Sequence, residues 1–509
     1  MSVARIASRA QIGLHAPLVQ VEVHLGAGLP TFSIVGLAAT AVKESKERVR
    51  AALINSNFEF PAGRITVNLA PADLPKEGGR FDLPIALGIL CASGQLAAHD
   101  LDHMELYGEL GLGGELKPVR GLFPAAVQAR ASGHLILVPA ANGVEAAVAA
   151  ADAAIGGSHL LEVCAHLSGT RLLARIPPPQ LNGPASSREQ PDLREVRGQC
   201  QAKRALAVAA AGAHSLLLVG PPGAGKSMLA QRLAPLLPPL GEAEALEVAT
   251  IASVSGQPFD PRRWRSRPFR APHHTASAGA MVGGGPQARP GEVSLAHHGV
   301  LFLDELPEFD RRVLEALREP LEAGTISVAR AALQAEYPAR FQLVAAMNPC
   351  PCGHEGDPGG RCRCKAAAIT RYRMRVSGPL LDRIDLRVAV GAVTHEELIG
   401  GEPSREDGSA GVAARVQTAQ DLQRARAAKL NAHLTPGELM RDAPVGREGE
   451  RLLAQARARL GLSARGYHRV VRVARTIADL EGLRTIEPRH VAEALQMRRA
   501  LASSGTATE

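Results

Sequence analysis

The 509-residue sequence contains no uninterrupted apolar run of about 18 residues, the minimum that a membrane-spanning helix needs. The nearest stretch, ALAVAAAGAHSLLLVG at 205–220, is interrupted by His214, Ser215 and two glycines. The N-terminus also lacks the apolar segment of a secretory signal peptide and leads directly into alternating, strand-like residues. We therefore expect a cytoplasmic protein with no membrane partner.

Cysteine and aromatic residues are scarce. Seven cysteines, an odd and low number for this length, argue against a disulfide-stapled scaffold and favour a reducing compartment. Apolar residues make up 46% and charged residues 21%, an ordinary balance for a protein that buries a core. The net charge of +8 weakly favours an anionic partner. An arginine-rich protein without such a partner would have the same charge.

The chain is too long for a single core, which rarely exceeds about 250–300 residues. Residues 1–175 alternate strand patterns (VQVEVHL, ITVNLA, HLILVPA) with helical ones, which predicts an α+β domain. Residues 176–191 are rich in proline and serine and indicate a linker. Residues 192–395 alternate apolar strands with helices, the α/β pattern of a parallel sheet covered by helices. Residues 396–509 predict a helical domain, with helices at 413–433, 447–460, 464–481 and 488–502.

The segment GPPGAGKS fits the phosphate-binding pattern G-x-x-x-x-G-K-[ST], with an apolar strand before it and a helical run after it. Its glycines let the backbone turn N–H groups toward phosphate oxygens at a helix N-terminus. Lys226 would reach the β- and γ-phosphates, and Ser227 would bind Mg²⁺. A glycine-rich loop that arose by chance is the alternative. The predicted nucleotide-binding residues are Gly220, Pro221, Pro222, Gly223, Ala224, Gly225, Lys226, Ser227 and Met228.

Two later apolar strands end in polar residues that complete such a site. GVLFLDELPEF ends in Asp304, which would hold magnesium through water, and Glu305, which would orient and deprotonate the attacking water. FQLVAAMNP ends in Asn348, which could lie between the two strands and contact the γ-phosphate or the water. The alternative for Asn348 is an asparagine that begins a turn before a proline.

Four of the seven cysteines lie in the glycine-rich stretch MNPCPCGHEGDPGGRCRC. Four thiolates suit a closed tetrahedral Zn²⁺ site that staples a polar loop. His354 could replace one sulfur, and free thiols or a reversible disulfide are the alternatives. Arginines surround the second pair, which suggests a metal-braced basic loop that couples hydrolysis to a polyanion. The candidate ligands are Cys350, Cys352, Cys362 and Cys364.

A second basic stretch, DPRRWRSRPFR at 260–270, places the only tryptophan among arginines. Such a composition can stack on bases and neutralise phosphates, so Arg262, Arg263 and Trp264 are candidate DNA contacts. The alternative is a solvated basic face.

Four long segments resemble the AAA+ magnesium-chelatase-like family, and most closely its ComM/YifB branch of competence-associated ATPases: PFRAPHHT (268–275), GGGPQARPGEVSLAHHGVLFLDELPEF (283–309), YPARFQLVAAMNPCPCG (337–353) and SGPLLDRIDL (377–386). The resemblance implies a ring, with a hexamer expected, whose ATP sites lie between subunits. Arg383 would be the finger that completes the neighbour's site, unless it only pairs with Asp382 or Asp385. Arg465 would be a second sensor on a helical lid. A hairpin within 325–341 would place Arg330 near DNA in the ring pore.

The N-terminal domain resembles the proteolytic domain of the Lon protease family, with a fold like domain 2 of ribosomal protein S5. PKEGGRF puts Arg80 at the expected position of the catalytic serine. YGELGLGGELKPVRGLF puts Phe123 at that of the lysine, although Ser93 and Lys117 are close in sequence. Without a nucleophile and a base, peptide hydrolysis is not expected. The domain would instead be a scaffold or bind a protein partner.

The resemblance implies an ATP- and Mg²⁺-dependent motor on single-stranded or branched DNA, of the helicase or branch-migration type, in transformation or recombination. One alternative is a magnesium-chelatase-type subunit that remodels a metal-insertion partner. Another is a protein-remodelling AAA+ chaperone. The basic loops favour the DNA motor.

Overall fold

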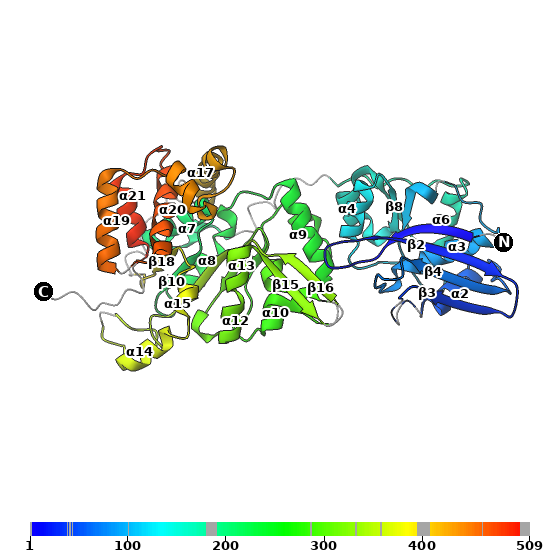
Figure 1. The fold of residues 1–509 in the computed structure, drawn as a ribbon, viewed down its shortest axis with the longest axis horizontal. Helices are drawn as coiled ribbons and strands as arrows, with labels where there is room; N and C mark the ends of the chain where they lie inside the picture. Colours follow the sequence, from blue (N-terminus) through cyan, green and yellow to red (C-terminus); the bar gives the residue numbers. More distant parts are fainter. Residues whose placement is uncertain are drawn as a thin grey trace. The chain divides into compact units, whose positions relative to one another are not determined.

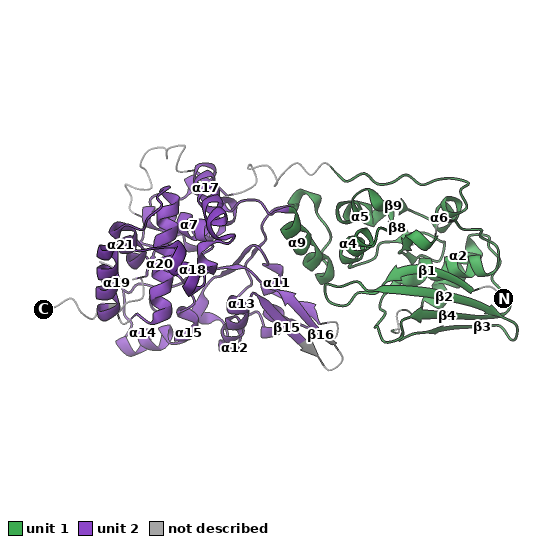
Figure 2. Ribbon diagram, turned by 45° about the horizontal axis from the view of Figure 1, so that its top comes forward, with its two compact units in different colours: residues 1–183, 242–264 green, residues 184–241, 265–509 purple. Residues whose placement is uncertain are grey.

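The computed structural model describes residues 3–37, 39, 42, 44–99, 101–179, 191–285, 288–330, 333–356, 359–393, 408–460 and 462–498. The chain forms two compact units (Figures 1 and 2). Unit 1 comprises Met1–Gly183 and Glu242–Trp264, and unit 2 comprises Pro184–Gly241 and Arg265–Glu509. Most of the predicted linker lies outside the described residues. Among the helices that are described, none has both the length and the apolar composition needed to cross a bilayer.

Unit 1 is built on a seven-stranded mixed sheet with the order β3-β4-β2-β1-β5-β8-β9. β2 and β4 bury alternate residues, because one face of each strand packs on the core. After Asp82 at its start, α3 is apolar, and it is almost entirely buried. The predicted α+β pattern is therefore present. The strands are β1 (Val3–Arg9), β2 (Leu18–Gly26), β3 (Thr31–Val35), β4 (Arg64–Ala70), β5 (Met104–Leu106), β8 (Leu135–Pro139) and β9 (Ala154–Gly157). The principal helices are α2 (Ser45–Asn55), α3 (Asp82–Ala92), α4 (Phe123–Ala131), α5 (Gly143–Ala150) and α6 (Leu160–Leu167).

Helix α9 (Glu242–Ser255) and the following residues to Trp264 fold with unit 1, although the sequence analysis places them inside the region 192–395. Phe259 stacks on Phe123 with ring centroids 5.8 Å apart. The Ser253 hydroxyl donates a hydrogen bond of 2.7 Å to Glu145. These contacts join residues that are far apart in the sequence, so local periodicity could not indicate them.

Unit 2 contains a five-stranded sheet with the order β11-β14-β17-β10-β18, and every neighbouring pair is parallel. β10, β14 and β17 are buried along their whole length, as expected for a parallel sheet covered on both faces. The predicted parallel α/β sheet is confirmed. The strands are β10 (Leu216–Val219), β11 (Phe269–Arg270), β14 (Val300–Leu303), β17 (Gln342–Met347) and β18 (Leu386–Ala389).

The C-terminal part of unit 2 is helical, and its apolar residues share one core with the sheet and with α7 (Cys200–Gly212). Each of the four predicted helical runs contains a helix, but the first ends earlier than expected and a short additional helix follows it. The C-terminal helices are α17 (Ser409–Ala427), α18 (Pro436–Asp442), α19 (Arg447–Leu460), α20 (Ala464–Leu480) and α21 (Pro488–Gln496).

The predicted hairpin is present in unit 2 as the antiparallel pair β15 (Thr325–Arg330) and β16 (Leu333–Pro338). Arg330 is the last residue of β15, and its side chain lies outside the described part of the chain.

Candidate nucleotide-binding site

The glycine-rich loop connects β10 to α8 (Lys226–Gln231) at the carboxyl edge of the sheet. Gly223 and Gly225 have φ angles of 77° and 85°, in the left-handed region that glycine adopts without strain. At Gly220 a Cβ atom would collide with the carbonyl oxygen of Val390, at the end of the neighbouring strand β18. The backbone conformation therefore requires glycine at two positions, and close packing requires it at the third.

Lys226 is buried in this loop. Its ammonium donates hydrogen bonds to the carbonyl oxygens of Gly220 and Pro221, both at 2.8 Å, and to Asn348 Oδ1 at 3.1 Å. Burial lowers the pKa of Lys226, while Asp304 and Glu305 act in the opposite direction. The acceptors on Lys226 are neutral oxygens, and a phosphate would accept a stronger hydrogen bond from the ammonium.

Ser227 and Asp304 meet at the start of α8. The Ser227 hydroxyl donates to Asp304 Oδ2 at 2.5 Å, and Asp304 Oδ1 accepts from the backbone N–H of Glu305 at 2.9 Å. A hydroxyl and a carboxylate side by side are hard oxygen ligands of the kind that Mg²⁺ prefers. These two residues therefore fit a magnesium ion. The strand order also brings Asn348 between the strands that carry Lys226 and Asp304, because β17 lies between β14 and β10.

Glu305 has a left-handed backbone, with φ of 53°, which is uncommon for any residue other than glycine. Its Oε2 atom lies 3.2 Å from Nδ1 of His274. His274 in turn packs edge-on against Phe309, with ring centroids 6.5 Å apart. Residues held in sparsely populated backbone regions are frequent at functional sites. Sequence reasoning missed His274, although it lies in the quoted segment PFRAPHHT.

Arg383 and Arg465 both contact one carboxylate oxygen, Oε1 of Glu322, near the end of α13 (Arg318–Ala323). Arg383 is 8% exposed and also donates to the carbonyl oxygen of Pro379 at 2.7 Å. Arg465 is 69% exposed and lies 3.4 Å from Glu322. Arg383 does not pair with Asp382 or Asp385, the two acids closest to it in the sequence; their partners are Arg387 and Arg469. Within the described residues, neither guanidinium forms a hydrogen bond or ion pair with the phosphate-binding loop.

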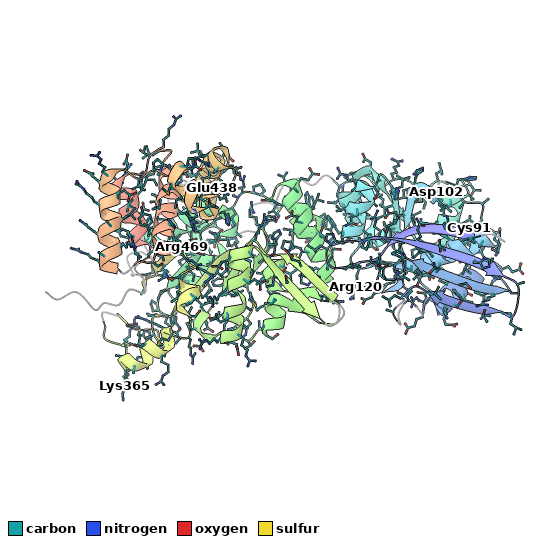
Figure 3. All side chains as sticks on the ribbon, in the orientation of Figure 1. Cys91, Asp102, Arg120, Lys365, Glu438 and Arg469 are labelled. Carbon is teal, nitrogen blue, oxygen red and sulfur yellow. The ribbon has the colours of Figure 1, made fainter. Side chains whose placement is uncertain are left out.

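Helix α20 holds the segment that carries Arg383. Arg469, one turn after Arg465 on α20 (Figure 3), pairs with Asp385 and donates to the Arg383 carbonyl oxygen at 2.8 Å. Burial alone would raise the pKa of Asp385, but His214 and Arg469 together hold it well below its ordinary value. An unpaired buried charge would be strongly unfavourable, so the paired carboxylate of Asp385 stabilises the contact between α20 and the segment that carries Arg383.

Comparison with known proteins also supports the assignment of a nucleotide-binding site. Family descriptions of magnesium chelatase match three stretches: "Subunit ChlI of Mg-chelatase" at 21–142, "Magnesium chelatase, subunit ChlI" at 192–398 and its C-terminal part at 406–498. Competence protein ComM of Haemophilus influenzae is 48% identical over 502 residues, 98% of each chain. The chain belongs to the ComM/YifB branch of the magnesium-chelatase-like family. YifB of Salmonella typhimurium, an uncharacterised protein, is 48% identical over 498 residues, 98% of this chain and 97% of its own.

A more distant similarity extends to the magnesium-chelatase 67 kDa subunit of Heliobacterium mobile, 25% identical over 246 residues. It covers 42% of this chain and 34% of that subunit. Membership of the magnesium-chelatase-like family supports ATPase activity with ATP and Mg²⁺, in agreement with the loop and acid geometry.

Cys350, Cys352, Cys362 and Cys364 of this ComM/YifB-branch protein form one cluster, with all ligand atoms within 4.8 Å of one another. The Sγ atom of Cys350 lies 3.4 Å from that of Cys352 and 3.8 Å from that of Cys362. Tetrahedral zinc with Zn–S bonds of about 2.3 Å requires sulfur separations of about 3.8 Å, so the cluster fits this ion. The backbone N–H of His354, hydrogen-bonded to Cys352, lowers the pKa of that thiol to about 6. The His354 side chain is not part of the cluster.

The cysteine loop contacts the phosphate-binding loop directly. Gly353 has φ of 81°, and a Cβ atom there would collide with the ring of Pro222. On its other side the cysteine loop is tied to α14 (Ala366–Arg373), because Arg373 pairs with Glu355 and donates to the Pro349 carbonyl oxygen at 3.2 Å. Lys365, which precedes α14, is exposed at the edge of the fold (Figure 3). The loop therefore connects the nucleotide site to a basic helix.

The candidate DNA contacts Arg262, Arg263 and Trp264 lie in unit 1. Arg262 and Arg263 are exposed and lie 3.1 Å and 3.9 Å from Asp260. Trp264 is half-buried, with its ring centroid 6.2 Å from that of Phe259 and 6.5 Å from that of Phe123. Its ring packs within its own unit, whereas the prediction requires a ring face that can stack on bases.

The structure places Arg80 and Phe123 in the interior of unit 1. Arg80 donates to Gln11 Oε1 at 3.1 Å and to the Arg120 carbonyl oxygen at 2.7 Å, and burial lowers its pKa. The Ser93 hydroxyl donates to the carbonyl oxygen of Leu90. Among the described residues, Ser93 and Lys117 are not hydrogen-bonded to each other. A serine activated by a lysine is therefore present neither at positions 80 and 123 nor at Ser93 and Lys117.

Proposed function

We propose that this protein is an ATP-hydrolysing ring motor that acts on DNA, of the helicase or branch-migration type, and serves DNA integration in transformation or recombination. The observation that carries the proposal is the convergence of Lys226, Ser227, Asp304 and Asn348 at one edge of the sheet, with Glu305 beside them. The full-length similarity to a competence protein supports the biological setting.

The chemistry follows from the positions of these side chains. Lys226 exchanges its carbonyl acceptors for phosphate oxygens and offsets the charge that develops on them. Ser227 and Asp304 would hold magnesium, whose charge would offset that of the β- and γ-phosphates. Glu305 leaves His274 and accepts the proton of the attacking water. Asn348, already linked to Lys226, orients that water or the γ-phosphate.

In this proposal, the ATP site is complete only when a second copy of the chain lies beside it. Arg383 and Arg465 lie together on Glu322 and not on their own phosphate-binding loop, so a neighbour's γ-phosphate is the anion they would meet in a ring. A guanidinium suits this role because it is planar, permanently charged and multidentate. We propose a homo-hexamer, with the helices from α17 to α21 as the lid.

Zinc at the cysteine cluster would brace the loop between Pro222 and α14. We propose that unit 1 has a Lon-like fold without protease activity and serves as a scaffold or as the surface that binds a protein partner. Arg262, Arg263, Trp264 and Arg330 remain candidate DNA contacts, of which the exposed Arg262 and Arg263 are the strongest.

A second candidate function is a chelatase-type subunit that spends ATP to remodel a metal-insertion partner, which the similarity to the Heliobacterium mobile subunit favours. The basic residues on α14 and the full-length similarity to a competence protein favour the DNA motor. A protein-remodelling chaperone is a third candidate, with unit 1 as its adaptor.

The deciding experiment measures the ATPase rate without DNA, with single-stranded DNA and with forked DNA, each across a salt series. A DNA motor predicts stimulation that falls steeply with salt, because phosphate contacts release counterions. Rates that are the same with and without DNA would contradict the proposal and favour a protein or porphyrin partner.

A further inference from the structure

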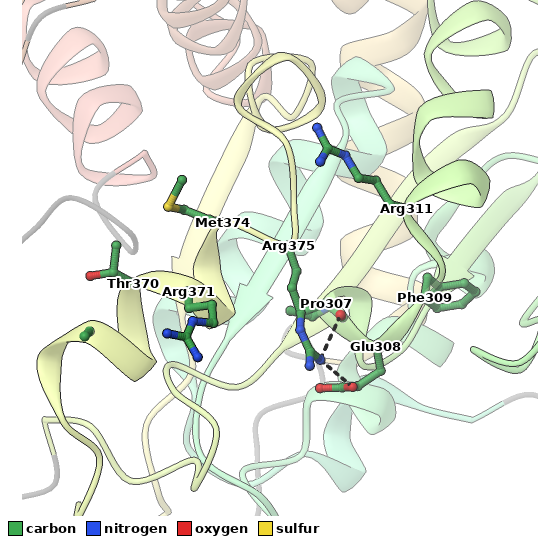
Figure 4. A pocket seen from close by; sticks show the side chains of 9 residues that line it. Pro307, Glu308, Phe309, Arg311, Thr370, Arg371, Met374 and Arg375 are labelled. Atoms are coloured by element: carbon green, nitrogen blue, oxygen red, sulfur yellow. Dashed lines mark hydrogen bonds and ion pairs between the residues drawn. The ribbon is translucent and has the colours of Figure 1, made fainter.

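Beside the acid pair, unit 2 contains an open cavity of about 960 Å³ (Figure 4). One wall is α14 with the two residues that follow it, and the other is formed by Pro307, Glu308, Phe309 and Arg311, shortly after Glu305 in the sequence. The cavity is within the size range of about 300–1,000 Å³ that is typical of sites for organic ligands. It does not overlap the phosphate-binding loop, so the nucleotide site does not account for it.

The lining of the cavity combines cations with apolar groups. Arg371 and Met374 extend from one wall and Arg311 from the other, while Arg375 points toward Glu308 (Figure 4). Met374 is 74% exposed, although it is a large apolar side chain. Arg311 and Arg371 are exposed and have no hydrogen bond or ion pair among the described residues. We call Arg311, Arg371 and Arg375 the arginine pocket.

Only one acid faces these three arginines within the described lining. Glu308 lies 2.7 Å from Arg375, and the two side chains are 44% and 52% exposed. An ion pair this exposed contributes little to stability, so an incoming anion can displace the carboxylate. The rest of the lining includes Thr370 and several apolar residues, of which Met374 is largely exposed while Pro307 and Phe309 are buried. Cations above an apolar surface suit a ligand with a phosphate at one end and a flat ring at the other.

Two contacts lead from the arginine pocket to Glu305. The backbone N–H of Glu308 donates to the carbonyl oxygen of Glu305 at 2.8 Å. Phe309 packs edge-on against His274, which holds the Glu305 carboxylate at 3.2 Å. A ligand that separates Arg375 from Glu308 therefore perturbs residues 308 and 309, which contact Glu305 and its partner His274.

We propose that the arginine pocket binds a nucleotide of single-stranded DNA and that this binding stimulates ATP hydrolysis by releasing Glu305 from His274. The phosphodiester lies between the arginines, and the base packs on Met374, the large exposed apolar side chain of the lining. This inference rests on the proposed function and adds to it the site at which DNA controls hydrolysis.

The test uses the full-length protein with an oligo-dT strand as probe. The R311A/R371A variant should hydrolyse ATP without DNA at the wild-type rate, bind oligo-dT about tenfold more weakly and lose most of the DNA stimulation. The slope of log affinity against log salt should fall by about 0.7 for each phosphate that the variant no longer neutralises. E308Q should have the opposite effect and bind oligo-dT more tightly, because Arg375 then loses its carboxylate partner.

A matched control, R64A/R171A, removes two exposed arginines from unit 1 and so makes the same change in net charge. An equal loss of affinity in this control would show a bulk charge effect and overturn the assignment. If DNA stimulates the wild-type protein and R311A/R371A equally, the pocket inference fails while the motor proposal stands. If no DNA stimulates the wild-type protein but polyglutamate does, both fail, since the pocket then takes an acidic polypeptide.

Discussion

The shared carboxylate of Glu322 allows a quantitative prediction about the proposed ring. E322Q removes the charge that holds Arg383 and Arg465 and leaves a side chain of the same size. Both side chains of the ion pair between Glu322 and Arg465 are exposed, so the pair contributes about 0–1 kcal/mol to stability. The bond to Arg383 is stronger because that guanidinium is 8% exposed, although Glu322 is 52% exposed. A hydrogen bond between charged groups contributes about 1.5–3 kcal/mol, so about 1–2 kcal/mol is reasonable here.

If Arg383 must leave Glu322 to reach a neighbour's phosphate, that free energy opposes assembly of the site. E322Q should then raise kcat/KM for ATP by up to about 5- to 30-fold, the ratio that corresponds to 1–2 kcal/mol. It should also lower the free energy of unfolding by a similar amount in a denaturant titration. E319Q on the same helix is the control, because Glu319 is exposed and has no arginine partner among the described residues. A loss of kcat/KM in E322Q as large as that of R383A would refute this reasoning.

Three further predictions concern the nucleotide site and its support. E305Q should retain ATP binding, measured with a fluorescent analogue, while kcat falls by at least about 100-fold, because water loses its base; a kcat near wild type would assign the base elsewhere. C350S should reduce zinc per chain, measured by atomic absorption, and lower Tm, because one of four thiolates is lost; a chain that never contains zinc would contradict this. G353A should weaken ATP binding in calorimetry about tenfold, because a left-handed alanine that also collides with Pro222 costs about 1–3 kcal/mol; unchanged affinity would show that the cysteine loop does not support the phosphate-binding loop.

Sequence reasoning predicted the parts of the site that depend on short, continuous stretches of the sequence. A glycine-rich loop after a strand, acids at the end of a second strand and Asn348 at the end of a third all lie at one edge once the strands are parallel. The buried strands and the helices around them were likewise visible as apolar patterns.

The contacts that link these parts could not be read from the sequence. His274 and Glu305, Gly353 and Pro222, and Glu322 with its two arginines join distant segments through the tertiary fold. The sequence analysis gave pairing with Asp382 or Asp385 as the alternative role for Arg383, but Asp385 pairs with Arg469 and Arg383 pairs with Glu322. The placement of α9 in unit 1 depends on aromatic packing of the same long-range kind.

The central claim is that Lys226 and the acid pair of one chain form a complete site only with Arg383 of another. Mixing two inactive variants, K226A and R383A, tests it most directly. In a mixed ring, an R383A subunit supplies an intact phosphate-binding loop and its K226A neighbour supplies the arginine. With random mixing at equal amounts, about a quarter of the interfaces are complete. We predict that ATPase activity reappears in the mixture and is absent from either variant alone. A mixture as inactive as its components would contradict the account.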